Sequence, residues 1–104
     1  MTCVELAARL AAGALLTLVD VRTPAEHALV ALPGSRLMPL HALDAAPDAA
    51  FEPLQGQEVV VYCHHGVRSL HGAAFLRARG VDAVSLAGGI DAWSREIDAS
   101  VLRY

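Results

Sequence analysis

Residues 59–69 read Val59-Val60-Val61-Tyr62-Cys63-His64-His65-Gly66-Val67-Arg68-Ser69. The β-branched run that opens this stretch predicts a buried strand over 58–62. The small and polar residues that follow predict a helix over 69–79, which ends at Gly80. Cys63 therefore lies at the carboxyl end of a strand, in a short loop that leads into a helix N-terminus. In open α/β sheets this is the usual place for a bound ligand.

The position of the loop indicates its chemistry. A helix N-terminus presents unpaired N–H groups and a partial positive charge, which favour anions and thiolates. Because the thiolate is the nucleophilic form of cysteine, Cys63 is the candidate catalytic residue. The backbone N–H groups of residues 64–69 are expected to form an anion-binding nest, for which Gly66 supplies the positive φ. Arg68 is a cation at a helix start, a misfit with the helix dipole that favours either anion binding or bracing of the loop.

The rest of the chain alternates between helix and strand patterns. Further strands are predicted over 15–21 and 81–86, with a short extended segment over 36–39. Further helices are predicted over 2–13, from Thr23-Pro24, over 40–46, and from Gly88-Gly89 through Trp93. This order predicts an α/β fold with a mostly parallel central sheet and helices on both faces. The length of 104 residues predicts one domain, spanning 1–104.

Composition narrows the classes of function. The net charge of −3 argues against nucleic acid and anionic membranes as partners. No run of about 18 apolar residues is present, so no membrane span is expected. The start of the chain lacks a basic segment, and its two cysteines, Cys3 and Cys63, do not form a disulfide framework, which favours a cytoplasmic location. Cys3 is expected to be a packing residue rather than a second reactive thiol.

Three motifs together resemble a single rhodanese domain and cover nearly the whole chain. They are Leu18-Val19-Asp20-Val21-Arg22 with Pro24, Glu26 and Pro33-Gly34-Ser35; the loop Cys63 to Arg68; and Leu86-Ala87-Gly88-Gly89-Ile90-Asp91-Ala92-Trp93. Residues 97–104 also look like the tail of small bacterial single-domain sulfurtransferases. The sequence departs from the family pattern at 30–32, where many relatives carry a histidine, and at Ala99 and Leu102, where proline is common.

The resemblance implies a sulfurtransferase that works by double displacement. Cys63 would take a sulfane sulfur from a small anionic donor such as thiosulfate, hold it as a persulfide, and pass it to cyanide, a thiol or a protein. The active-site loop would comprise His64, His65, Gly66, Val67, Arg68 and Ser69. Structural support is expected from Asp20, from Arg22 paired with a carboxylate, and from Glu26. Gly88, Gly89 and Trp93 are expected to support the structure as well: the two glycines let the backbone turn tightly beside the active-site loop, and Trp93 lies in the core and anchors the last helix.

Other functions fit the sequence less well. The phosphatases and arsenate reductases of this fold have one more residue in the cradle than the four between Cys63 and Arg68, so sulfur transfer is favoured. A non-catalytic binding module would commonly lack Cys63, whereas a protein-to-protein persulfide carrier stays open as an alternative. No metal or cofactor is predicted, because adjacent histidines such as His64 and His65 rarely fit one tetrahedral site and neither Cys63 nor His71 completes zinc spacing. His71 is expected on the surface.

Overall fold

A four-stranded parallel sheet forms the centre of the computed structural model, which describes all residues from 1 to 104. The strands are β1 (Leu16–Asp20), β2 (Arg36–Leu37), β3 (Glu58–Tyr62) and β4 (Asp82–Ser85), in the order β2-β1-β3-β4. The two inner strands, β1 and β3, are paired from Leu16↔Glu58 to Asp20↔Tyr62. The mostly parallel sheet expected from the alternating pattern is confirmed, and the carboxyl ends of β1 and β3 lie side by side.

Strand β3 is buried on both faces, as its continuous apolar sequence predicts. Side chains alternate across a strand, so Val59 and Val61 enter one apolar cluster while Val60 and Tyr62 enter another on the opposite face. The four side chains are fully buried. The sheet therefore separates two cores, and Cys63, which follows β3 directly, belongs to the first.

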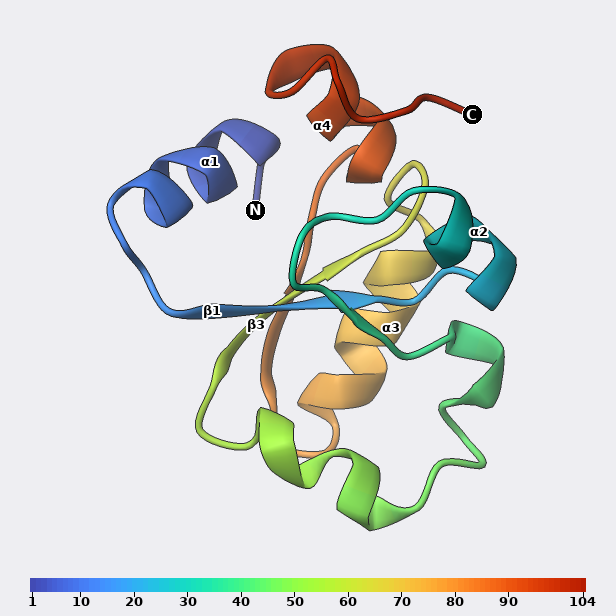
Figure 1. Cartoon of the computed structure of the whole chain (residues 1–104). Helices are drawn as coiled ribbons and strands as arrows, with labels where there is room; N and C mark the ends of the chain where they lie inside the picture. Colours follow the sequence, from blue (N-terminus) through green and yellow to red (C-terminus); the bar gives the residue numbers. More distant parts are fainter.

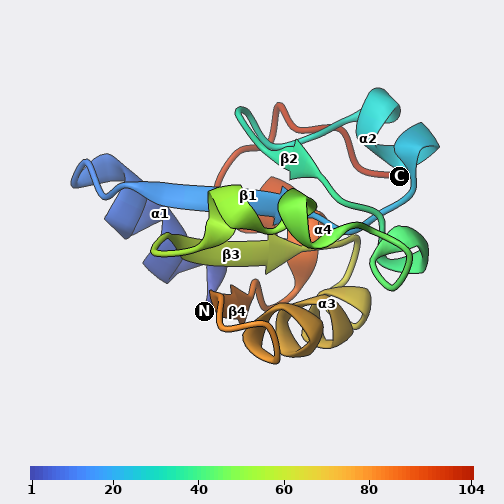
Figure 2. The same cartoon turned by 90° about the horizontal axis from the view of Figure 1, so that it is seen from below.

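Helices cover both faces of this sheet, as predicted. Helix α3 (Arg68–Arg77) lies over the first core, together with three short 3₁₀ turns over residues 40–54, whereas α1 (Cys3–Ala11) and α4 (Gly89–Glu96) lie over the second (Figures 1 and 2). Helix α2 (Pro24–Leu29) is short and follows the carboxyl end of β1. None of these helices combines the length and apolar character needed to cross a lipid bilayer.

Two expectations are corrected. The helix predicted over 40–46 is a single 3₁₀ turn, Leu40–Ala42. Pro47 disfavours the α conformation of the residue before it, and a segment this short gains too few hydrogen bonds to sustain a helix. Trp93, expected in the core, is only partly buried and packs against the edge of the second cluster.

Candidate active site

The Cys63 side chain is held at the centre of the loop between β3 and α3. Cys63 is only 1% exposed to solvent. Its Sγ accepts hydrogen bonds from the backbone N–H groups of Gly66 at 3.1 Å and Ser69 at 3.3 Å. Gly66 has a φ of +105°, the positive value expected, and this conformation turns its N–H toward the sulfur. These amides form a nest that favours negative charge on Sγ.

A hydroxyl pair extends the contacts of the sulfur. The Cys63 thiol donates to Ser69 Oγ at 3.4 Å, and Ser69 Oγ lies 2.7 Å from Ser85 Oγ at the end of β4. A hydroxyl hydrogen can rotate, so Ser69 can instead donate to Cys63 once the thiol has lost its proton. Val67, by contrast, is an exposed residue at the start of α3 and makes no side-chain hydrogen bond there.

The loop carbonyls are bound by a second helix. The N–H groups of Ile90 and Asp91, in the first turn of α4, donate to the carbonyl oxygens of Cys63 at 2.9 Å and His64 at 3.0 Å. Gly88 and Gly89 both have positive φ where α4 begins. The tight turn expected beside the loop is therefore present, and it brings the helix N-terminus directly against the loop backbone.

Replacing Gly89 with alanine is expected to destabilise the protein strongly. A Cβ at this position would lie 2.5 Å from the carbonyl oxygen of His64 and against that of Cys63, and φ is +61°. Gly13 is the matched control, because its φ is +82° but nothing lies within 4 Å of an added Cβ. In urea denaturation we expect G13A to cost about 1 kcal/mol and G89A to cost at least about 2 kcal/mol more. Equal losses would contradict the close approach.

Arg68 braces the loop to α2. Its Nη1 and Nη2 donate to the two carboxylate oxygens of Glu26, at 2.7 and 3.0 Å. Arg68 holds the pKa of the Glu26 carboxyl well below its usual range, so the pair stays ionised at neutral pH. Glu26 is itself fixed by a reciprocal cap with Thr23 at the start of α2. Of the two roles expected for Arg68, bracing is the one that this geometry displays.

Asp20 and Arg22 form a fully buried ion pair where the chain leaves β1. Arg22 donates from Nε to Asp20 Oδ1 at 2.9 Å and from Nη2 to Oδ2 at 2.7 Å, so the carboxylate partner expected for Arg22 is Asp20. Burial raises the pKa of Asp20, but the hydrogen bonds from Arg22 and His27 outweigh it and leave that pKa below its usual value. Arg22 Nη2 also donates to the carbonyl of Val30 at 2.6 Å, within the segment that departs from the family pattern.

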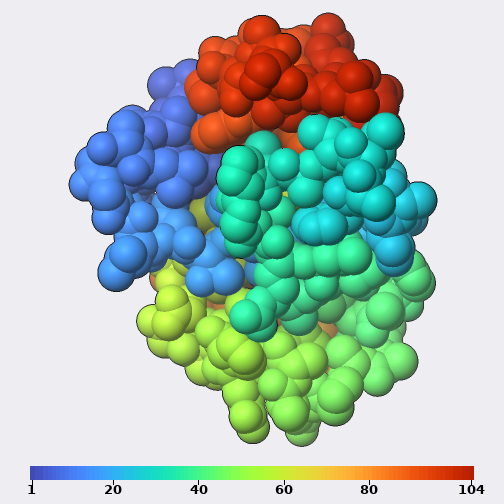
Figure 3. Space-filling view, viewed as in Figure 1, coloured from blue at the N-terminus to red at the C-terminus, as the bar shows by residue number.

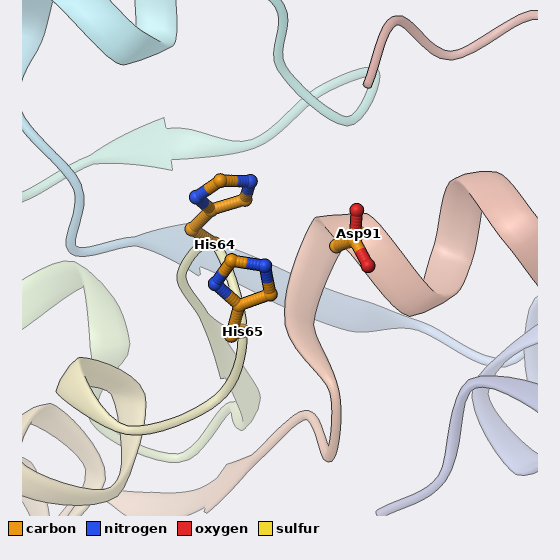
Figure 4. Close-up of side chains that lie close together, drawn as sticks. All are labelled: His64, His65 and Asp91. Atoms are coloured by element: carbon orange, nitrogen blue, oxygen red, sulfur yellow. The ribbon is translucent and has the colours of Figure 1, made fainter. Parts of the chain in front are cut away.

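His64, His65 and Asp91 come together at the mouth of the loop, with their possible ligand atoms within 4.8 Å of one another (Figure 4). The two imidazoles are stacked, with centroids 3.8 Å apart and planes 29° apart. Nitrogen lone pairs lie in the ring plane, so stacked rings direct them side by side rather than toward one ion. Asp91 already accepts hydrogen bonds from Arg95 and Arg103, at 3.0 and 3.1 Å. This arrangement gives no support to a metal site, and the absence of a metal stays a prediction.

The remaining predicted residues lie away from the sulfur. His71 is exposed. Cys3 is buried in the second core, across the sheet from Cys63, and burial raises the pKa of its thiol. It is thus placed as a packing residue.

Two residues of the site were missed by the sequence analysis. Ser85 could have been found from the parallel register, which sets it beside Val61 at the end of the neighbouring strand. Tyr104 contacts Glu26, Arg22 and His64. No local pattern indicates these contacts, because they join segments far apart in the sequence.

The fold and the loop geometry define a class of protein, and comparison with known proteins identifies it. The family model of the rhodanese-like domain matches residues 2–96. This protein belongs to the rhodanese family.

Individual relatives agree with this assignment. The chain is 40% identical to a sulfurtransferase of Allochromatium vinosum, over 88% of this chain and 83% of that protein. It is 37% identical to the probable adenylyltransferase/sulfurtransferase MoeZ of Mycobacterium tuberculosis over 96% of this chain, but it spans only 26% of the length of that relative.

Solved structures show the same fold. A rhodanese-like domain protein from Staphylococcus aureus superposes with a TM-score of 0.82 at 28% identity, covering 100% of this chain and 96% of that one. The human single-domain sulfurtransferase TSTD1 gives a TM-score of 0.78 at 28% identity, covering 92% of this chain and 95% of that one.

Proposed function

We propose that this protein is a sulfurtransferase that carries a sulfane sulfur as a persulfide on Cys63. The observation that supports this most directly is the pair of backbone N–H groups, from Gly66 and Ser69, directed at Cys63 Sγ. Such donors stabilise negative charge on sulfur, first on the thiolate and then on the outer sulfur of the persulfide. Relatives named as sulfurtransferases, which match this chain over most of its length, point the same way.

The reaction would consist of two displacements with no net oxidation. The Cys63 thiolate attacks the outer sulfur of thiosulfate, the sulfur–sulfur bond of the donor breaks, and sulfite leaves with the bonding electron pair. Cyanide or a thiolate then attacks the outer sulfur of the persulfide, and the electron pair of that bond returns to Cys63. Covalent catalysis of this kind gives ping-pong kinetics. Ser69, buried and within reach of Sγ, would accept or donate a hydrogen bond as the charge on sulfur changes.

Arg68 would have two functions in this scheme. Its two N–H contacts with Glu26 fix the end of the loop, and its side chain is still 36% exposed. A guanidinium has five N–H donors, so others remain for the sulfonate oxygens of an anionic donor. In the cytoplasm, where we place the protein, thiols stay reduced and Cys63 remains available.

Intact-mass spectrometry after incubation with thiosulfate tests the proposal. We expect a gain of about 32 Da, one sulfur atom, which cyanide then removes. A protein-to-protein persulfide carrier is the second candidate, and it would give no adduct with thiosulfate but the same gain from a protein persulfide donor. A chain that acquires no sulfur from either source would be a binding module, and the proposed function would be wrong.

A further inference from the structure

The segment that follows α4, residues 98–104 (here the tail), runs across the molecule to α2. Figure 3 shows the end of this segment against the surface formed around residues 25–35. Two contacts fix its path: Ser94 Oγ donates to the carbonyl of Val101 at 2.6 Å, and Arg103 Nε donates to Asp91 at 3.1 Å. Tyr104 is thereby brought to the mouth of the active-site loop.

Tyr104 makes two polar contacts there. Its hydroxyl donates to Glu26 Oε2 at 2.6 Å and accepts from Arg22 Nη1 at 2.8 Å. Burial, together with the neighbouring Glu26 carboxylate, raises the pKa of Tyr104 to about 12 although Arg22 opposes the shift, so the hydroxyl keeps its proton and remains a donor. Glu26 is the partner of Arg68, so this hydroxyl joins the Arg68–Glu26 pair to the buried Asp20–Arg22 pair.

The ring of Tyr104 contacts the other end of the loop. It stacks on the His64 imidazole with centroids 3.9 Å apart and planes only 7° apart. His64 Nε2 is buried and has no hydrogen-bond partner. The His64 ring is therefore held by stacking on Tyr104 and on His65 rather than by a hydrogen bond at that atom. Burial, followed by the neighbouring His65, lowers the pKa of His64, which keeps the stacked ring neutral near pH 7.

The Tyr104 side chain is thus connected to both ends of the sulfur-binding loop. It contacts His64, which follows Cys63, and it is linked to Arg68 through Glu26. The residues between them include Gly66, and Ser69 follows Arg68; these two supply the amides that face Cys63 Sγ. We infer that Tyr104 is a positioning residue, which sets the direction of these two N–H groups toward the sulfur without touching the sulfur itself.

Its contribution to sulfur transfer rests on the proposed function, whereas its effect on the two amides does not. Small errors in the placement of groups around a reacting atom cost large factors in rate. Removing the ring and hydroxyl together removes the contacts of Tyr104 with both His64 and Glu26, while removing the hydroxyl alone leaves the stack on His64.

The test compares Tyr104→Ala, Tyr104→Phe and a control, Leu102→Ala. Leu102 lies in the same tail, is half exposed and makes no side-chain hydrogen bond. Amide hydrogen exchange is measured by NMR at Gly66 and Ser69 and, as an internal reference, at Val60 and Val61 in β3. We expect Y104A to raise exchange at Gly66 and Ser69 about tenfold relative to β3. Y104F should retain most of the protection, and L102A should match the unaltered protein.

Persulfide formation from thiosulfate is then followed by mass for the same proteins. We expect a fall of about tenfold in the limiting rate for Y104A, at unchanged stability of β3, and partial rescue in Y104F. Exchange at Gly66 and Ser69 that rises no more than in β3 would show a merely structural role and overturn the inference. Faster exchange with an unaltered limiting rate would overturn it as well. If the unaltered protein forms no persulfide from any donor, the proposed function fails, and the exchange data alone decide whether Tyr104 positions the amides.

Discussion

Replacing Cys63 with serine is expected to abolish sulfur transfer while the chain still folds. A serine hydroxyl is not ionised at neutral pH and is a weak nucleophile without an adjacent base, so no sulfur would be displaced from thiosulfate. The smaller oxygen still accepts from the amides of Gly66 and Ser69, which now face Cys63 Sγ. The folded state should therefore keep its loop.

Mass spectrometry and thiocyanate production measure this effect directly. The protein with C63S should show no gain of about 32 Da with thiosulfate and no thiocyanate formation above the uncatalysed rate. Cys3→Ala is the matched control, because Cys3 is the other cysteine and lies in the core across the sheet. C3A should acquire the cyanide-labile sulfur normally. Sulfur transfer at an undiminished rate in C63S would contradict a mechanism that forms the persulfide on Cys63.

Replacing Arg22 with methionine is expected to cause the largest loss of stability. Both members of the Asp20–Arg22 pair are fully buried, and the shorter apolar side chain would leave the Asp20 carboxylate without its cation. Removing one partner of such a pair costs about 3–5 kcal/mol. The free energy of unfolding in urea measures it. Arg95→Ala, which removes an exposed partner of Asp91, is the control and should shift the urea midpoint little.

The pH dependence gives a second test of the same pair. The pKa of Asp20 is lowered in the folded state, so its contribution to stability is present above the unfolded value of about 3.9 and is lost as pH falls through the folded one. Between pH 5 and about 3 the unaltered protein should therefore lose stability more steeply than the double variant Asp20→Asn/Arg22→Met, which lacks this ionisation. Parallel losses over that range, or a cost of less than about 1 kcal/mol for R22M alone, would contradict the role assigned to the pair.

The features that could be predicted from the sequence are those set by local pattern. The apolar run 59–62 predicts a buried strand, and Gly66 predicts a turn with positive φ; both are present. The loop after β3 follows from these two features. The failure at 40–46 has a local cause as well, since Pro47 restricts the residue before it more strongly than the apolar spacing favours a helix.

The features that could not be predicted depend on contacts between distant segments. Tyr104 and Glu26 are 78 positions apart, and only the path of the tail across the molecule brings them together. The partner of Arg68 was likewise open, because two roles fit a cation at a helix start equally well until Glu26 is placed beside it. A single sequence contains no direct signal for such pairs.

The hydrogen bonds from α4 to the loop carbonyls have a consequence for which ligands the site admits. A stretch of backbone offers as many carbonyl oxygens as N–H groups, and so has no electrical preference of its own. Here the oxygens of Cys63 and His64 are occupied by the first turn of α4, while the N–H groups of Gly66 and Ser69 face the sulfur. The peptide groups around Cys63 are thereby sorted by polarity, with donors facing inward and these two acceptors turned away. Inward-facing N–H groups stabilise an anionic sulfur at Cys63. The same groups disfavour a metal cation there, although a thiolate alone would be a good ligand for one.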